Sequence, residues 1–248
     1  MALPFDLSAG AGLWLAALIL GAAVIRGYSG FGFSALVVAG AALVTQPLHF
    51  VAVVLICEVI LTAQAARGAL PDVDWGRVGR LMAGAVVGLP LGVWALTSVG
   101  IDTARIVIAV FVLAMCAILL AGWRVARELR GLPEAGVGLA SGLANAAAMA
   151  GLPVAAFFAA QPISPAGFRA TLIAYFAIVD LATLPFLWRA GHVSGDSLLA
   201  VGLALPLLLL GNWAGSRRFL AAAPRDFRRM AIGLLAVLAL LGLGRAFV

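Results

Sequence analysis

The second half of this 248-residue chain repeats the layout of its first half, and this repeat limits the possible folds more than any other feature. At a shift of about 120 residues, glycines fall on glycines, a proline falls on a proline and one acidic residue falls on another. A duplicated hydrophobic unit whose matching points are of these kinds is typical of membrane transporters. The aligned pairs include Gly32 with Gly151, Glu58 with Asp180, Gly88 with Gly211, Gly92 with Gly215, Pro47 with Pro165 and Arg105 with Arg228.

The composition agrees with a membrane protein. Hydrophobic residues make up 65% of the chain, charged residues only 10%, and the mean hydropathy is +1.16. A soluble domain carries roughly a quarter charged residues. All 16 basic residues are arginines, and they lie in short clusters between apolar runs. This pattern indicates loops that follow the positive-inside rule and excludes nucleic-acid binding as the reason for the net charge of +6.

Six apolar runs are long enough to cross the hydrocarbon core, which takes about 20 residues. They fall into two sets of three, one set in each half of the chain. The runs are Leu48–Ala66, Arg77–Val99, Thr103–Trp123, Ala166–Trp188, Asp196–Ser216 and Phe227–Phe247.

A pair of shorter apolar segments, interrupted by glycine or proline, precedes each set of three. In the first half, Gly10–Ile25 is followed by the interruption 26–34 and then a short run to Val44. In the second half, Glu134–Met149 is followed by the interruption 150–153 and then a short run to Ala160. Within a helix, glycine costs about 1 kcal/mol and proline about 3 kcal/mol relative to alanine, so we expect the helices to break there.

The placement of arginine predicts how many times each half crosses the membrane. If each interrupted pair counts as two crossings, each half has five segments, and 13 of the 16 arginines lie on one face. If the pair counts as one crossing, the split is 8 against 7. The positive-inside rule favours the first arrangement. We therefore expect an all-α integral membrane protein with both termini on the non-cytoplasmic face. It would consist of two inverted repeats, 1–130 and 131–248, of about five helical segments each, or 8–10 transmembrane segments in total.

The order of these breaks resembles the sulfite exporter TauE/SafE family of membrane permeases. The resemblance rests on Gly27-Tyr28-Ser29-Gly30-Phe31-Gly32, on Gly142 with Gly151-Leu152-Pro153, and on the stretches Gly84–Gly92 and Gly211–Gly215. It covers nearly the whole chain. It implies a carrier of sulfur-containing anions, such as sulfite and organosulfonates, in a family often described with about eight spans. Members often carry more glycines in the first break, where this chain has Phe33 and Ser34.

The two breaks are the first candidates for a substrate site. A helix that restarts inside the membrane has unpaired N–H groups and a partial positive charge at its amino end, and both favour an anion. Side-chain hydrogen bonds from Ser34 and Asn145 would add to them. The alternative is that the glycines only allow close helix packing. The candidate substrate-binding residues are Ser29, Gly30, Phe31, Gly32, Phe33, Ser34, Asn145, Met149, Gly151, Leu152 and Pro153.

Glu58 and Asp180 each lie in the middle of an apolar run. A charged carboxylate at that depth costs about 2.5–3.5 kcal/mol on insertion scales. Burial favours the protonated form of a carboxyl group, so either residue could carry a proton in coupled transport. Alternatively, Arg26 or Arg169 neutralises one of them, or each makes a structural hydrogen bond between helices.

The sequence therefore predicts a secondary transporter that exports small sulfur-containing anions by alternating access in a bacterial cytoplasmic (inner) membrane. An anion channel and a non-transporting scaffold subunit remain alternatives. We find no catalytic, metal-binding or nucleotide-binding pattern, so the chain is not expected to be an enzyme or to hold a cofactor. The predicted partners are a small anion and the lipid bilayer, and a homodimer is left open.

Overall fold

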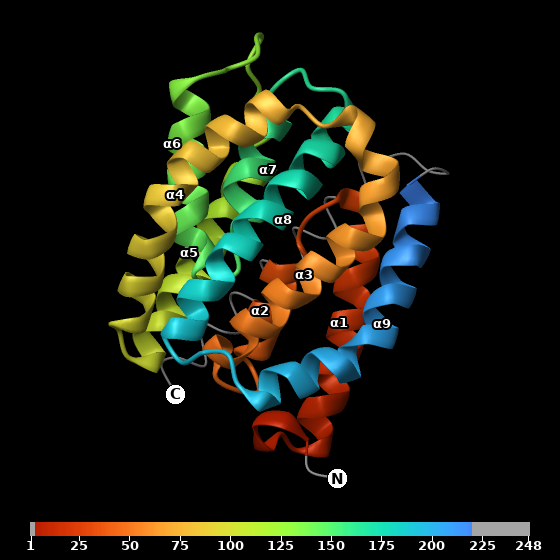
Figure 1. The fold of residues 1–248 in the computed structure, drawn as a ribbon, viewed down its shortest axis with the longest axis vertical. Helices are drawn as coiled ribbons and strands as arrows, with labels where there is room; N and C mark the ends of the chain where they lie inside the picture. The colour runs from red at the N-terminus through yellow and green to blue at the C-terminus, as the bar shows by residue number, and fades with distance from the viewer. Residues whose placement is uncertain (1–2, 220–248) are drawn as a thin grey trace.

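The computed structural model describes residues 3–219, and within this range the chain forms α-helices and two short 3-10 helices, with no β-strand. The all-α prediction is confirmed for this part of the chain (Figure 1). The α-helices are α1 (Ala9–Ser29), α2 (Phe33–Ala41), α3 (Pro47–Ala69), α4 (Trp75–Thr97), α5 (Ile101–Ala121), α6 (Leu132–Asn145), α7 (Gly151–Ala159), α8 (Pro165–Arg189) and α9 (Gly195–Phe219). The 3-10 helices are η1 (Pro4–Asp6) and η2 (Leu70–Asp72).

Six of the described helices are long and apolar enough to cross a membrane, namely α1, α3, α4, α5, α8 and α9. Five of them coincide with predicted runs. The remaining predicted run, Phe227–Phe247, lies outside the described residues. The chain is thus an integral membrane protein that crosses the bilayer several times.

The segments around the two breaks differ from prediction at their ends. α1 does not stop at Ile25 but continues to Ser29, so it is long enough to span the membrane by itself. α6 ends at Asn145, four residues earlier than expected, and Pro153 lies within α7 rather than in the break. Proline is tolerated there because the N–H groups of the first turn have no partner within the helix.

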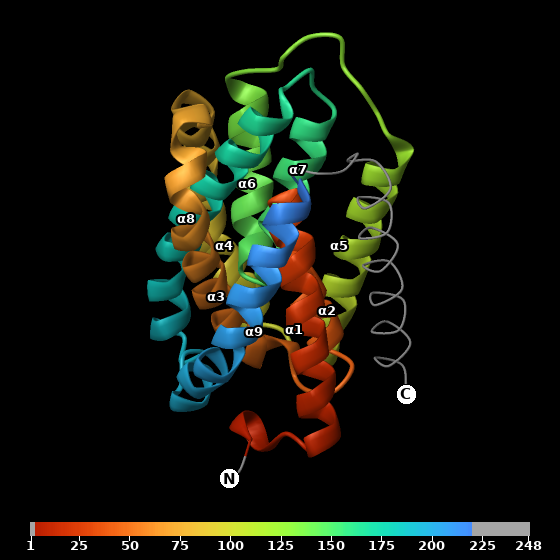
Figure 2. The same ribbon diagram turned by 90° about the vertical axis from the view of Figure 1, so that its right-hand side faces the viewer.

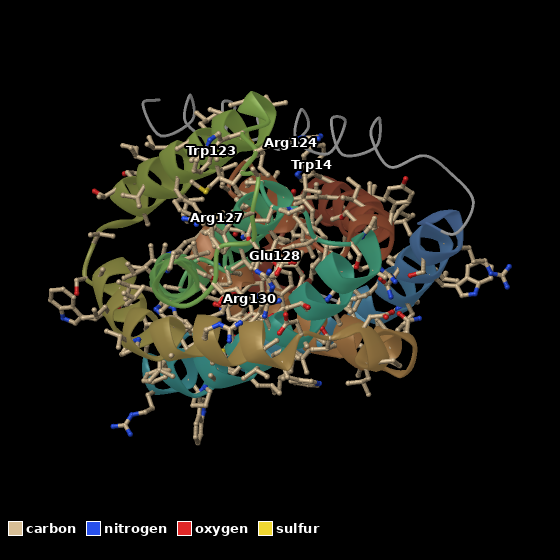
Figure 3. The ribbon with its side chains drawn as sticks, turned by 90° about the horizontal axis from the view of Figure 1, so that it is seen from above. Trp14, Trp123, Arg124, Arg127, Glu128 and Arg130 are labelled. Carbon is tan, nitrogen blue, oxygen red and sulfur yellow. The ribbon has the colours of Figure 1, made fainter. Side chains whose placement is uncertain are left out.

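Successive α-helices, the short ones included, run alternately up and down the long axis of the molecule (Figures 1 and 2). The connections α3–α4, α5–α6 and α7–α8 lie at the upper end, and α4–α5 and α8–α9 lie at the lower end (Figures 1 and 2). The upper end carries Arg124, Arg127 and Arg130 in the loop before α6 (Figure 3). The starts of α4 and α8, with Arg77 and Arg169, lie at the same end. We call it the arginine-rich end, and by the positive-inside rule it is the end predicted to face the cytoplasm.

A network of ion pairs ties the elements together at this end. The Arg77 guanidinium is 2% exposed and lies 2.9 Å from Glu128, 3.0 Å from Glu134 and 3.4 Å from Asp74. The hydrogen bond from Arg130 holds the pKa of Glu128 below its usual value, and the charge of Arg77 acts in the same direction. Burial raises the pKa of Asp74, but the backbone N–H of Arg77 and the nearby arginines outweigh it, so that pKa is lowered too.

Two pairs of parallel helices are packed through glycine. α4 lies along α6, and α1 lies along α9. A Cβ atom on Gly88 would overlap the carbonyl oxygen of Leu139, and one on Gly215 would overlap that of Val24. Small residues let membrane helices approach closely in this way. Between the two pairs, α3 packs against α8, and the short helices α2 and α7 complete the centre.

Candidate functional site

The first break separates α1 from α2 at residues 30–32. Gly30 has φ 82° and Gly32 has φ 96°, values that glycine adopts easily and other residues rarely. α2 begins at Phe33, has no side-chain cap, and makes its first backbone bond from the N–H of Leu36 to Gly32. The amides at the start of α2 are therefore among the free donors that every α-helix presents at its amino end.

The second break lies between α6 and α7, at residues 146–150. Ala148 in this turn has φ 57°, a left-handed conformation that costs a non-glycine residue roughly 1–3 kcal/mol. α7 begins at Gly151 and, like α2, has no side-chain cap. A second uncapped helix thus starts inside the protein.

Both helix starts face one small cavity between the two halves of the chain. Its volume is about 10 Å³, enough for roughly one water molecule. Four of its twelve lining residues have polar side chains, one each from α2, α3, α6 and α8. The lining residues are Gly32, Ser34, Ala35, Glu58, Asn145, Ala148, Met149, Ala150, Gly151, Leu152, Phe176 and Asp180.

On the first-half side of the cavity, the buried carboxylate belongs to an ion pair. Arg26 on α1 donates from Nε to Glu58 on α3 at 2.5 Å and from Nη2 to Thr62 at 3.1 Å. The Ser34 hydroxyl donates to the other carboxylate oxygen at 2.7 Å. Arg26 and Glu58 are 1% and 3% exposed, so the two charges neutralise each other inside the protein.

On the second-half side, the corresponding carboxylate has neutral partners. The Asn145 side-chain amide donates to Asp180 at 3.0 Å and to Thr183 at 2.9 Å. The Thr183 hydroxyl in turn donates to the carbonyl of Val179 at 2.7 Å. Asn145 occupies the position of Arg26 in the repeat, at the shift of 119 residues that aligns Gly32 with Gly151. Among residues 3–219, no salt bridge involving Asp180 is found.

The family model described as "Sulfite exporter TauE/SafE" matches residues 15–241. The chain belongs to this family. TauE/SafE is a family of membrane transporters, so the chain is a transporter by membership, in agreement with its apolar helices. No curated protein and no solved structure is significantly similar to it.

Six of the substrate-binding residues predicted for this TauE/SafE member line the central cavity. They are Gly32, Ser34, Asn145, Met149, Gly151 and Leu152.

The other five lie elsewhere. Ser29 and Phe31 line a second cavity on the arginine-rich side, together with Arg169. Gly30, Phe33 and Pro153 line neither cavity.

Two predicted donors, Ser34 and Asn145, bind carboxylates. Ser34 donates to Glu58 and Asn145 donates to Asp180. Of the two arginines considered as partners for the carboxylates, Arg26 pairs with Glu58, whereas Arg169 donates to the carbonyl of Gly27 at 3.0 Å.

Sequence reasoning missed the threonines next to the carboxylates and one aromatic residue of the cavity. Thr62 follows Glu58 by four residues and Thr183 follows Asp180 by three, spacings that place both on the same helix face as the acid. This shared polar face was a readable signal. The sequence held no such signal for Phe176, because phenylalanine is common in apolar membrane-spanning segments.

Proposed function

We propose that this TauE/SafE protein is a secondary carrier that exports small sulfur-containing anions, sulfite or organosulfonates, across the inner membrane by alternating access. The main support is the meeting of two uncapped helix starts, those of α2 and α7, at one buried polar cavity. Each amino end carries a partial positive charge, and the start of α2 also offers free N–H groups, which together favour an anion. At the start of α7 the N–H of Leu152 already bonds the carbonyl of Met149 and Pro153 has no N–H, so Gly151 is the residue there that can offer its amide. Gly32 and Gly151 let a ligand approach the backbone closely.

The pairing of the helices supports two inverted repeats, 1–130 and 131–248. α1 of the first repeat packs on α9 of the second, and α6 of the second packs on α4 of the first. The contacts repeat in register as well. Gly88 meets Leu139, and its counterpart Gly211, at a shift of 123 residues, meets Leu20. Leu20 is in turn the counterpart of Leu139 at the shift of 119 residues that also relates the breaks. α1 and α6, the first helices of the two repeats, run in opposite directions (Figures 1 and 2).

The charges around the cavity support a role for Asp180 as the proton-binding group. The charges of Arg26 and Glu58 cancel, so the residues around the central cavity carry one net negative charge when Asp180 is ionised. An ionised Asp180 would repel an anion at the neighbouring helix starts, whereas the protonated form would not. Proton binding and anion binding therefore favour each other, and linkage makes this effect reciprocal. In this proposal Arg26 and Glu58 are structural.

The size of the cavity supports a moving carrier. A space of about 10 Å³ holds one water and is too small for a sulfur oxyanion. Binding therefore requires the helices around the breaks to separate. In inverted-repeat carriers, one bundle rocks against the other around such a midplane site.

Flux into and out of proteoliposomes tests the proposal. Gly32→Leu and Gly151→Leu should each abolish saturable sulfite or sulfonate flux while the protein stays folded in the membrane. Gly79→Leu is the control, because nothing lies within 4 Å of a Cβ at Gly79. Undiminished flux in both break variants would contradict the site, and flux without counterflow would indicate a channel.

The role of Asp180 is tested by varying the pH gradient and the membrane potential separately. An inside-negative potential of 100 mV favours export of a monovalent anion alone by about 2.3 kcal/mol. Co-transport of one proton cancels this charge and with it the drive that the potential gives to export, so the coupled flux should follow the anion gradient and the pH gradient and should not respond to the potential. Asp180→Asn should remove the dependence on the pH gradient. A pH-gradient dependence that persists in Asp180→Asn, or that is lost only in Glu58→Gln, would overturn the assignment.

A further inference from the structure

A second cavity, of about 220 Å³, opens near the arginine-rich end between the end of α1, the end of α7 and the start of α8. We propose that this cavity is the cytoplasmic vestibule of the carrier. In it, Arg169 binds the head group of an organosulfonate and aromatic side chains bind its short apolar tail before it enters the central cavity. The inference rests on the proposed transport of sulfur-containing anions and adds a site and a substrate preference to it.

Arg169 is held at the vestibule wall by the end of α1. Its Nη2 atom donates to the carbonyl of Gly27 at 3.0 Å and to the hydroxyl of Ser216 at 3.3 Å. A Cβ atom on Gly30 would lie 2.9 Å from Cγ of Arg169, so glycine at this position lets the arginine stem lie against the first break. The guanidinium is permanently charged, and its planar set of donors matches the oxygens of a sulfonate.

The rest of the vestibule is mainly aromatic and aliphatic. Phe31 and Phe168 form an edge-to-face pair with ring centroids 6.3 Å apart, and Phe158 packs on Phe168 at the same separation. Apolar walls stabilise an alkyl group by removing it from water. A bare inorganic anion gains nothing from these walls and loses hydration. The combination of one cation with an aromatic wall therefore favours a sulfonate with a short tail over sulfite.

The vestibule and the central cavity meet at two short segments of chain. Phe31 lines the vestibule and the next residue, Gly32, lines the central cavity. On α7, Ala155 lines the vestibule one turn after Gly151, which lines the central cavity. The Phe31 side chain is 8% exposed and packs on Phe168, next to the point where the chain passes from one space to the other. It is positioned to act as the gate between them.

The equivalent positions in the first repeat carry no charged side chain. At the shift of 118 residues that aligns Pro47 with Pro165, Arg169 corresponds to Val51 and Phe168 to Phe50. Val51 is 1% exposed and Phe50 is 2% exposed, whereas Arg169 and Phe168 are half-buried. The charged group of the vestibule therefore has no counterpart at these positions of the first repeat.

The test uses the full-length protein in proteoliposomes, with ethanesulfonate and sulfite added on the arginine-rich side. Arg169→Gln should raise the KM for ethanesulfonate roughly tenfold or more, the loss expected for a hydrogen-bonded charge. Arg169→Lys should retain part of the affinity. Arg124→Gln is the matched control, because Arg124 is an exposed arginine in the loop at the same end. It should change the KM less than twofold.

A labelling experiment tests the gate without relying on transport. In a background with Cys57 and Cys116 replaced by alanine, Ser34→Cys places a thiol in the central cavity. Phe31→Ala should raise its rate of modification by a membrane-impermeant thiol reagent from the arginine-rich side by about tenfold or more. It should not raise the rate from the opposite side.

The outcomes separate this inference from the proposed function. If the wild type carries neither anion, the proposed function fails, and the labelling still decides the vestibule. If the wild type carries ethanesulfonate but Arg169→Gln leaves its KM unchanged, or Arg124→Gln raises it equally, Arg169 is not the binding group. Wild-type competition by methane-, ethane- and propanesulfonate requires no variant. If none of these alkanesulfonates binds more tightly than sulfite, the apolar part of the site is overturned.

Discussion

Replacing the two midplane carboxylates, one at a time, should have very different effects on stability. Glu58→Gln removes the negative partner of Arg26 and leaves a buried guanidinium without a counter-charge. Breaking a buried pair in this way costs about 3–5 kcal/mol. Asp180→Asn keeps the side-chain shape and keeps an oxygen for the hydrogen bond from Asn145, and it leaves no salt bridge broken. Its cost should stay near that of one altered neutral hydrogen bond, about 1 kcal/mol.

The two variants should therefore differ by at least about 2 kcal/mol, which is more than tenfold in the unfolding equilibrium constant. Reversible unfolding in mixed detergent micelles, followed by circular dichroism, measures this difference. The double variant Arg26→Met/Glu58→Gln is the internal control, because it removes both charges and should recover most of the loss. Two results would contradict the contrast between a paired and an unpaired carboxylate. One is that Asp180→Asn is as destabilising as Glu58→Gln, and the other is that Arg26→Met/Glu58→Gln is no more stable than Glu58→Gln alone.

Two further predictions concern packing and pH. Gly88→Ala should destabilise the protein by about 1–3 kcal/mol, since the added methyl meets the backbone of Leu139. Gly79→Ala, where the methyl meets nothing, should stabilise α4 by up to about 1 kcal/mol. Equal melting temperatures of the two variants would refute the close contact at Gly88. Because the folded-state pKa of Glu128 is lowered by Arg130, its contribution to stability is present above the ordinary pKa of 4.5 and is lost as the pH falls through the lower folded value. Melting temperatures at pH 3–6 should therefore fall less steeply in Glu128→Gln than in the wild type, and identical pH profiles would contradict the ion pair.

The helices were readable from the sequence, but the ends next to the breaks were not. Arg26 and Gly27 suggested that the first helix stops at Ile25. The helix continues because Glu58, 32 residues later in the chain, neutralises Arg26, and because Gly27 lets the backbone of Asn212 approach closely. Both reasons are tertiary contacts, and single-sequence patterns do not report them.

The candidate site was likewise predictable from the sequence only in part. The repeat located the breaks and the two carboxylates, because glycine and acidic residues stand out in apolar runs. It did not say which arginine pairs with which acid, since Arg26 and Arg169 are both near a break in sequence. One clue was present, however. Asn145 occupies the repeat position of Arg26, so the second carboxylate could already be expected to have an amide rather than a cation beside it.

The proposed proton-binding residue, Asp180, and the vestibule arginine, Arg169, both lie where the two halves of the sequence differ. The order of elements is the same in both halves: a helix (21 residues in α1, 14 in α6), a break, a nine-residue helix and a long helix with a buried acid. The side chains differ at the points that matter for chemistry. An ion pair in one half corresponds to an amide–acid pair in the other, which leaves Asp180 as the unpaired carboxylate. An exact copy would carry two compensated acids and no group whose proton could respond to an anion. The duplicated backbone therefore builds the cavity, and the departures from the repeat supply the means to couple it.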